Sequence, residues 1–467
     1  MAEKSVETII SLKKSFDNPI FKRLLKFVVK RDKCGSRLEI AINQYLGKKV
    51  NACWKCKIAG KIVSYAIRNG GKIFGVSEKE IKEGLKENVF KKGLINVLEG
   101  IAEYGITKPQ KVAAPFLIVW DFTHACNLKC KHCYERADKP LPDELTTKEA
   151  KKLVDHLVEI GTVAVAFSGG EPLMRKDFFE VAKYTHKKGL YVALATNGTL
   201  ITEKIAKKLS KCVDYVEISL DGANSKTHDS FRGIKGAFNR TIRGIKNCVK
   251  VGLYTCIATT STKYNIKEIP KIYDLACKLK VNRMIVFNFI PTGKGVEIAK
   301  KDLTPEEREK LLTFLAEKLI NNEGVETFST APQYARVTME YGACAPTHFY
   351  AAGEANEKIL QLAEFIGGCG AGRIYCAIEP NGDVQPCVFM PIKVGNIREK
   401  KFHDIWKNSK VFNDLRDRTK LKGNCSNCKY KFVCGGCRAR AYAYFNDYMA
   451  PDPGCILNKK EWEKIAK

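Results

Sequence analysis

Three cysteines lie close together in the segment CNLKCKHCY, at Cys126, Cys130 and Cys133. Cysteine thiolates bind zinc ions and iron–sulfur clusters, and a closed site of either kind takes four protein ligands. Three thiolates on a four-iron cluster would leave one iron open to a small molecule. The alternative is a zinc ion held by the same three cysteines together with His124 or His132.

A second group of cysteines lies towards the C-terminal end, in the segments CGAGRIYCAIEPNGDVQPC and CSNCKYKFVCGGC and at Cys455. Such spaced cysteines in a long chain without an N-terminal signal indicate metal binding in a reducing cytoplasm rather than disulfides. The eight thiols of this group suffice for two iron–sulfur clusters with four ligands each. Because C-x2-C pairs are also common in zinc ribbons, zinc is the alternative here as well.

Three further cysteines, Cys34, Cys53 and Cys56, lie in the N-terminal region, and Cys344 and His348 lie further along the chain. Together these side chains could bind another metal. The alternative is that the C-x2-C pair of the segment NACWKC packs inward on one helix turn.

Six short apolar runs follow one another between residues 116 and 289, separated by amphipathic helical stretches: FLIVWDF, TVAVAFS, LYVALAT, DYVEISL, LYTCIATT and NRMIVFNF. This alternation predicts an α/β fold, with parallel strands and covering helices curled into a partial (β/α)6 TIM-like barrel. In such sheets the chemistry lies at the C-terminal ends of the strands. The three cysteines, SGGEP, the TNG that contains Asn197, and DG all follow predicted strands.

The chain is expected to divide into four parts. Residues 1–110 are predicted to form a basic helical N-terminal domain, and residues 111–300 the partial barrel. Residues 301–366 form a helical linker region, and residues 367–467 a small cysteine-rich domain organised around metal.

The region 116–289 resembles the radical S-adenosylmethionine superfamily, through its C-x3-C-x2-C-aromatic motif and the GGEP that follows the second strand. The resemblance implies that Cys126, Cys130 and Cys133 ligate a [4Fe–4S] cluster whose remaining iron binds S-adenosylmethionine. An electron from this cluster then cleaves the cofactor to a 5′-deoxyadenosyl radical. Tyr134 is implied to pack beside the cluster.

The same resemblance implies which residues contact the cofactor. The motif of Gly169, Gly170, Glu171 and Pro172 is matched to its amino group, with close backbone approach at the glycines and a charged hydrogen bond to Glu171. Ser219 and Asp221 are matched to the ribose, and Arg232 to the carboxylate. Asn197, at the end of the third strand, completes the expected cofactor site.

The C-terminal region resembles the SPASM domain, a module that carries two auxiliary four-iron clusters. Cys369, the G-x4-C of Gly382 and Cys387, and the C-x2-C-x5-C run carry this resemblance. It implies an inner cluster held by Cys369, Cys376, Cys387 and Cys437, and an outer cluster held by Cys425, Cys428, Cys434 and Cys455. This sequence departs from the commoner final spacing C-x3-C, because CGGC places Cys434 and Cys437 closer together.

The chain carries a formal charge of +29, from 80 basic and 51 acidic side chains. The lysines are scattered along helices, so we expect no specific nucleic-acid partner, and the charge instead suits an acidic ferredoxin or flavodoxin as electron donor, or a polycarboxylate substrate. No run of about 18 apolar residues occurs, which predicts no transmembrane span. A cytoplasmic enzyme is expected.

The resemblance implies a radical enzyme whose substrate is open to several interpretations. The first expectation is an unactivated carbon of a peptide or protein side chain, modified by oxidation or crosslinking. Val388 stands where the formylglycine-forming members have an aspartate base, which disfavours that oxidation. No general base is identified.

Three alternatives for the function stay open. CGGCRARA resembles the ending of tetrapyrrole side-chain decarboxylases and deacetylases of the alternative haem pathway. A lipid is another substrate, because FKRLLKFVVK could rest on an anionic membrane surface. The last alternative is a non-catalytic iron–sulfur scaffold, which would not cleave S-adenosylmethionine.

Overall fold

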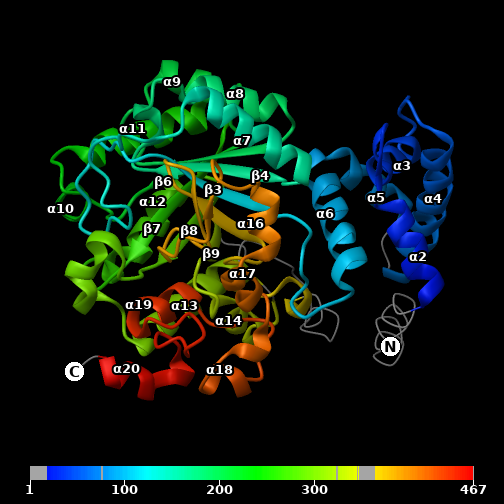
Figure 1. Ribbon diagram of the computed structural model, residues 1–467. Coiled ribbons are helices and arrows are strands. Elements are labelled where there is room, and N and C mark those ends of the chain that lie inside the picture. The colour runs from blue at the N-terminus through cyan, green and yellow to red at the C-terminus, as the bar shows by residue number, and fades with distance from the viewer. Residues whose placement is uncertain (1–17, 75–76, 322–323, 344, 346–362, 466–467) are drawn as a thin grey trace.

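Six parallel strands form the centre of the computed structural model, which describes residues 18–74, 77–321, 324–343, 345 and 363–465 (Figure 1). They coincide with the six apolar runs of the sequence, because each run is a short stretch of buried residues bounded by turns. The strands are β3 (Leu117–Thr123), β4 (Ala164–Gly169), β5 (Tyr191–Thr196), β6 (Tyr215–Ser219), β7 (Tyr254–Ser261) and β8 (Arg283–Asn288).

Helices connect these strands and cover one face of the sheet (Figure 1). Capping boxes at Thr146 with Glu149 and at Thr304 with Glu307 fix the starts of two of them. The helices are α7 (Thr147–Ile160), η1 (Pro172–Met174), α8 (Phe178–Lys187), α9 (Glu203–Leu209), α10 (Ser225–Arg232), α11 (Ala237–Lys250), η2 (Ile266–Glu268), α12 (Ile269–Lys278), η3 (Gly293–Lys301) and α13 (Pro305–Ile320).

The sheet continues beyond the predicted six strands at both edges. On one side β9 (Glu326–Ser329) pairs parallel with β8. On the other, β10 (Tyr375–Ile378) pairs parallel with β3, and β11 (Asp383–Gln385) and β12 (Gly395–Asn396) follow antiparallel. The strand order β12-β11-β10-β3-β4-β5-β6-β7-β8-β9 does not close on itself, and the predicted α/β partial barrel is confirmed. The cysteine-rich segment therefore shares a sheet with the barrel.

Buried aromatic side chains pack between the sheet and its helices. Trp120 and Phe122 lie two positions apart on β3, so both point to the same face. They contact Phe167 of β4 and Phe178 of α8, with ring centroids 5.1 to 6.2 Å apart. Burying each of these side chains contributes about 1.5–3 kcal/mol to stability. Asp121, between the two aromatic residues of β3, points to the opposite face, into the barrel.

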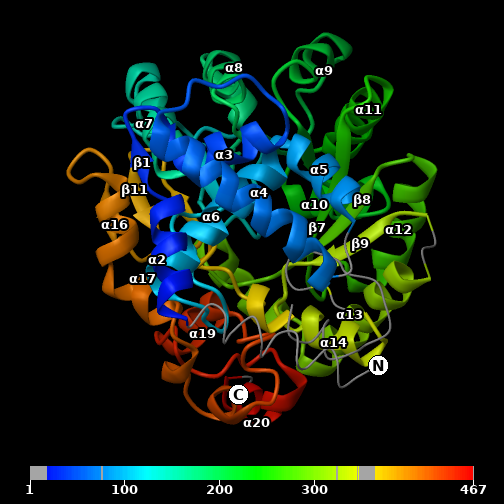
Figure 2. The same cartoon turned by 90° about the vertical axis from the view of Figure 1, so that its right-hand side faces the viewer.

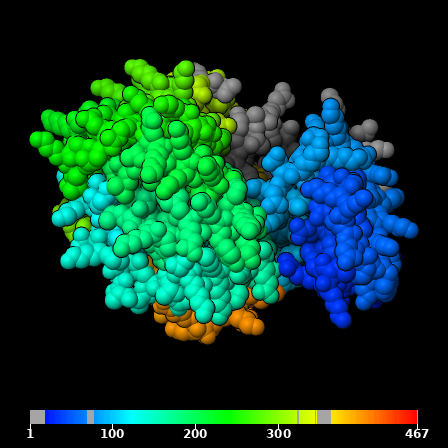
Figure 3. All heavy atoms as spheres, turned by 90° about the horizontal axis from the view of Figure 1, so that it is seen from above, coloured from blue at the N-terminus to red at the C-terminus, as the bar shows by residue number. Residues whose placement is uncertain are grey.

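The N-terminal helices form a lobe beside the barrel, visible as a separate mass in Figure 3 and across the front of the molecule in Figure 2. Asn96, on the last helix of the lobe, donates to the carbonyls of Ala114 and Gly161 and so ties the lobe to the barrel. A short hairpin, whose strands β1 and β2 have two residues each, was not predicted. The elements are α2 (Pro19–Val28), β1 (Arg31–Asp32), β2 (Gly35–Ser36), α3 (Arg37–Tyr45), α4 (Trp54–Phe74), α5 (Glu78–Lys86) and α6 (Asn88–Tyr104).

Short helices complete the C-terminal part, beside and below the barrel in Figure 1. They are α14 (Tyr334–Glu340), α16 (Phe402–Asn408), α17 (Lys410–Leu415), η4 (Arg418–Lys420), α18 (Asn424–Asn427), α19 (Arg438–Phe445), η5 (Ile456–Asn458) and α20 (Lys459–Ile465). Cys344 and His348 lie outside the described residues. Within the described ranges, none of the helices combines the length and the apolar character needed to cross a membrane.

Candidate active site

The loop that carries Cys126, Cys130 and Cys133 begins directly after β3 and is held by backbone hydrogen bonds. The Cys126 amide donates to the Asp138 carbonyl at 3.0 Å. The amides of Lys129 and Lys131 donate to the carbonyls of Arg232 and Phe231, at the end of α10, at 3.1 and 3.0 Å. The loop is therefore fixed at the C-terminal edge of the sheet, as predicted for the chemistry of this fold.

The zinc alternative for this loop fails on spacing and on its histidines. A tetrahedral zinc ion with 2.3 Å bonds places its sulfurs about 3.8 Å apart. Among the described residues, two groups of three ligand atoms lie within 4.8 Å of one another, and neither contains these cysteines. The His124 nitrogens contact the carbonyls of Lys139 and Glu135 at 3.0 and 2.8 Å. The His132 ring stacks on Phe231 instead.

The two glycines of SGGEP bring the end of β4 onto the backbone just before Cys126. Gly169 has a φ of +109°, and Gly170 has its α-carbon so close to the carbonyl of Ala125 that a side chain would collide with it. The amides of Gly170 and Glu171 donate to the carbonyls of Thr123 and Ala125, both at 2.8 Å. These glycines were predicted to let the backbone approach the cofactor. In the structure they let the end of β4 approach the cysteine loop of the protein itself.

We expect Gly170→Ala to lower the iron content and the thermal stability of the protein, because the added methyl group meets a backbone carbonyl that cannot move without displacing the loop. Gly60→Ala is the matched control, since its methyl group meets the end of the flexible Gln44 side chain. Iron analysis and a melting curve compare the two variants. Equal iron content and equal Tm for both would contradict this role of Gly170.

The buried Glu171 carboxylate joins the ends of β4 and β5. It accepts hydrogen bonds from the Thr196 hydroxyl at 2.8 and 2.9 Å, from the Asn197 amide at 2.8 Å and from the Leu173 amide at 3.2 Å. Burial raises the pKa of Glu171 to about 7, although these donors act in the opposite direction. Pro172 follows as the first residue of η1. These hydrogen bonds indicate that Glu171 positions the ends of β4 and β5 relative to each other.

Asn197 extends this network from β5 to the cysteine loop. Its side-chain amide donates to Asn127 Oδ1 at 2.8 Å, and its Oδ1 accepts from the Thr199 amide and hydroxyl at 2.9 and 2.6 Å. The Asn127 side-chain amide in turn donates to the Thr199 hydroxyl at 2.9 Å. The residues predicted after β3, β4 and β5 thus form one hydrogen-bonded edge.

Asp221 and Arg232 are brought together beside the loop. Asp221 Oδ2 lies 2.5 Å from Arg232 Nε, and Asp221 Oδ1 accepts from the Thr260 amide at 2.7 Å. Arg232 Nη1 lies 3.7 Å from Cys130 Sγ. Burial raises the pKa of Cys130, and the buried cation of Arg232 acts in the opposite direction. Ser219 is the last residue of β6, two positions before Asp221.

Tyr134 joins the loop to a group of one buried and two half-buried carboxyl residues that was not predicted. Its hydroxyl donates to Asp121 Oδ1 at 3.0 Å and lies 3.0 Å from Ser168 Oγ. Oxygens of Asp121, Glu135 and Glu379 all lie within 4.8 Å of one another. Burial raises the pKa of all three carboxyls. The sequence feature that could have indicated this group is Asp121, the single charged residue in the apolar run FLIVWDF.

Three of the four thiols predicted for the inner cluster lie in one buried group: Cys369, Cys387 and Cys437. The Tyr375 hydroxyl donates to Cys387 Sγ at 3.0 Å. Burial raises the pKa of Cys387 and of Cys437 to about 12, and the neighbouring thiol of Cys369 acts in the same direction on both. These three side chains therefore share one environment.

The structure does not bring Cys376 to the other three, which corrects its prediction as a ligand of the inner cluster. Neighbouring residues of a strand point to opposite faces. Because Tyr375 reaches Cys387, Cys376 points away from it and packs in the main barrel core, opposite Ile118 of β3. Burial raises the pKa of Cys376, and the charged group near it is Arg416, not a thiol.

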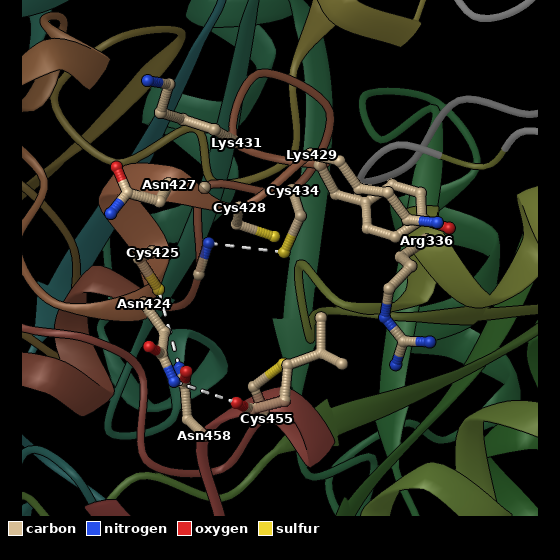
Figure 4. A pocket seen from close by; sticks show the side chains of 14 residues that line it. Arg336, Asn424, Cys425, Asn427, Cys428, Lys429, Lys431, Cys434, Cys455 and Asn458 are labelled. Carbon is tan, nitrogen blue, oxygen red and sulfur yellow. Dashed lines mark hydrogen bonds between the residues drawn. The ribbon is translucent and has the colours of Figure 1, made fainter.

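The four thiols predicted for the outer cluster line a cavity of about 270 Å³ (Figure 4). They are Cys425, Cys428, Cys434 and Cys455. The Gly436 backbone amide donates to Cys434 Sγ at 3.3 Å, and the Asn458 side-chain amide donates to Cys425 Sγ at 3.6 Å. Four cysteines around one cavity, with donors aimed at their sulfurs, fit a cluster with four thiolate ligands.

Comparison with protein families identifies two of the three cysteine-bearing regions. A family model described as the radical SAM superfamily matches residues 120–276, and a model described as an iron–sulfur cluster-binding domain, SPASM, matches residues 369–429. The N-terminal lobe lies outside both matches.

Curated relatives cover about three quarters of the chain. The AdoMet-dependent heme synthase of Methanosarcina barkeri is 42% identical over 351 residues, which are 73% of this chain and 97% of that protein. The Fe-coproporphyrin III synthase of the same organism is 34% identical, over 74% of this chain and 88% of that protein. The mycofactocin maturase MftC of Mycolicibacterium smegmatis is 32% identical, over 73% and 83%.

The fold is also that of a solved structure. Streptococcus suis SuiB bound to S-adenosylmethionine superposes with a TM-score of 0.65 at 18% identity, over 90% of this chain and 93% of that chain. At this identity the likeness concerns the fold alone.

These relatives overturn the prediction of a peptide or protein side chain as the substrate, because those at 34 to 42% identity are named for haem and coproporphyrin. They also exclude the non-catalytic scaffold. The chain is an enzyme of the radical S-adenosylmethionine superfamily with a C-terminal SPASM domain, and its cofactors are S-adenosylmethionine and [4Fe–4S] clusters.

Proposed function

We propose that this enzyme oxidatively decarboxylates propionate side chains of an iron tetrapyrrole, as a haem synthase. The observation that carries the proposal is the 42% identity to an AdoMet-dependent heme synthase across 97% of that protein's length. The ending CGGCRARA, which resembles tetrapyrrole decarboxylases, and the formal charge of +29, which favours a polycarboxylate, support it further.

The proposed ligands of the initiating cluster are Cys126, Cys130 and Cys133. When bound, this cluster supplies the electron that cleaves S-adenosylmethionine to a 5′-deoxyadenosyl radical. Asp221, Arg232 and the network of Glu171 and Asn197 orient the cofactor at the strand ends, with Ser219, Gly169, Gly170 and Pro172 at its edge. Auxiliary clusters are proposed at Cys369, Cys387 and Cys437, and at Cys425, Cys428, Cys434 and Cys455.

The oxidative decarboxylation of a propionate balances in atoms and electrons without a base from the protein. Conversion of a propionate side chain to a vinyl group releases one hydrogen atom, one molecule of carbon dioxide and one electron. The bound cofactor would take up the hydrogen atom, and a bound iron–sulfur cluster would accept the electron. The protein therefore has to hold the propionate near the cofactor and accept the electron.

The carboxyl group formed by Asp121, Glu135 and Glu379 suits this task. Glu135 follows Cys133 by two positions in the cysteine loop. The neighbouring Tyr134 ring contacts Phe389, two positions after Cys387, with ring centroids 5.0 Å apart, so the group lies near both cluster sites. Because burial favours the neutral acids, Asp121 and Glu379 can donate hydrogen bonds to a propionate instead of repelling it.

The electron donor is proposed to be an acidic ferredoxin or flavodoxin in the cytoplasm. The surplus of 80 basic over 51 acidic side chains would attract such a partner. The rate of reduction should then fall as ionic strength rises, because salt screens surface charges.

Anaerobic turnover with iron-coproporphyrin III, S-adenosylmethionine and a reductant tests the function. We expect haem, with one 5′-deoxyadenosine formed for each carboxyl group removed, and chromatography with mass spectrometry measures both. Metal-free coproporphyrin is the control for the requirement for iron. Formation of 5′-deoxyadenosine with no change in the mass of the tetrapyrrole would contradict this substrate while leaving the radical chemistry in place.

A further inference from the structure

Three cysteines meet in the N-terminal lobe, in the part of the chain that neither family model covers. Cys34 lies in the turn between β1 and β2, Cys53 directly precedes α4, and Cys56 lies in the first turn of α4. Their sulfurs all lie within 4.8 Å of one another, although the hairpin and the helix are separated in sequence by α3.

The spacing of these sulfurs fits a single tetrahedral ion. Cys53 Sγ and Cys56 Sγ are 3.6 Å apart, close to the spacing of about 3.8 Å that zinc–thiolate bonds of 2.3 Å impose. A disulfide would require about 2.05 Å. In this respect the group differs from Cys126, Cys130 and Cys133, which are not within 4.8 Å of one another.

A helix N-terminus and a buried guanidinium lie beside the three thiols. Cys53 and Cys56 lie at the N-terminus of α4, where unpaired amides and the helix dipole stabilise negative charge. The buried guanidinium of Arg37 donates to both oxygens of Asp32, at 2.6 and 2.9 Å, and to the Phe27 carbonyl at 2.8 Å. It therefore fixes the hairpin and adds a positive charge nearby.

A carboxylate is available beside the thiols as well. Asp32 Oδ2 lies 3.8 Å from Cys53 Sγ. Since zinc also binds carboxylate oxygen, Asp32 or a water molecule can occupy the fourth position.

The lobe has a structural need for such a link. β1 and β2 are two residues long, and an isolated hairpin of this size is not stable in water. The aliphatic core of the lobe, which includes Leu38, Ile42 and Leu85, contains no residue of β1 or β2. A metal ion that joins the hairpin to α4 would replace the missing packing, as structural zinc does in other small domains.

We propose that Cys34, Cys53 and Cys56 bind a structural zinc ion that fastens the β1–β2 hairpin to the start of α4. Binding displaces the three thiol protons and involves no change of oxidation state. The site is separate from the iron–sulfur clusters and does not depend on the substrate of the enzyme.

Metal analysis of the anaerobically reconstituted protein tests the proposal. We expect one zinc ion per chain in the wild type and its loss in the double variant Cys53→Ser/Cys56→Ser, with iron unchanged. Cys34→Ser, at an exposed turn position, should lower zinc affinity without unfolding the lobe. Cys277→Ser is the matched control and should keep both metals.

Cobalt substitution gives an independent readout of the ligands. Cobalt bound at this site should show thiolate-to-metal charge-transfer absorption, which weakens when Cys34 is replaced. Zinc that survives in the double variant, iron in place of zinc at this site, or no zinc in the wild type after incubation with zinc and dialysis would each overturn the proposal. S-adenosylmethionine cleavage, measured on the same samples, reports separately on the radical site.

Discussion

Replacing Cys130 by alanine is expected to abolish cleavage of S-adenosylmethionine and to remove about four irons per chain. Two thiolates from the loop cannot hold a four-iron cluster in place of three, and Arg232 loses the sulfur that lies 3.7 Å from its guanidinium. Liquid chromatography of 5′-deoxyadenosine after reduction measures the first effect, and iron analysis measures the second. The auxiliary clusters should persist, because their thiols lie in a different part of the chain.

Cys277→Ser serves as the control for a general effect of losing a thiol. Cys277 lies on α12, and we assign it no ligand role. Its variant should retain both iron and cleavage. If Cys130→Ala still produced 5′-deoxyadenosine at the wild-type rate, the assignment of this loop to the initiating cluster would be wrong.

Periodicity was sufficient to find β3 to β8, since each of these strands is a run of buried residues. It did not find β9 or β10. The segments ETFS and YCAI are four residues long and lie among polar residues and glycines, so nothing local distinguishes them from loops. Their place in the sheet is decided by pairing with β8 and β3, which lie far away in the sequence.

The types of residue in the site were predictable, whereas their partners were not. The motif SGGEP identified Glu171, but the carboxylate receives its hydrogen bonds from Thr196 and Asn197 of another strand. Likewise, Asp221 and Arg232 were assigned to different parts of the cofactor, and the fold places them in contact. Contacts of this kind arise from the register of neighbouring strands, which spacing in one sequence does not specify.

The substrate was mispredicted for a related reason. Motifs report on the cofactor, whose binding residues are local, while the substrate meets side chains from several strand ends. Asp121 of β3 and Glu379 after β10 form one group with Glu135, although Asp121 and Glu379 lie more than 250 residues apart in the sequence. This group suits a substrate that carries carboxylates.

The inner cluster allows the sharpest test, because opposite results are expected for Cys387 and Cys376, which the sequence both assigned to it. Cys387→Ala is expected to lose about four irons per chain and the formation of haem, since it removes a thiol that receives a hydrogen bond from Tyr375 and lies with Cys369 and Cys437. Cys376→Ala should keep its iron and its activity, with a lower Tm, because it removes one buried sulfur from the barrel core.

Both variants remove a fully or nearly fully buried cysteine from the same region, so a loss of packing alone would lower the iron content of both. Loss of iron in Cys387→Ala alone would therefore identify Cys387 as a ligand. The electron paramagnetic resonance spectrum of the reduced Cys387→Ala variant should then lack the signal of one auxiliary cluster. Equal loss of iron in Cys376→Ala would restore that residue as a ligand and would require β10 to turn over when the cluster binds, because its side chain faces the opposite side of the strand from Tyr375.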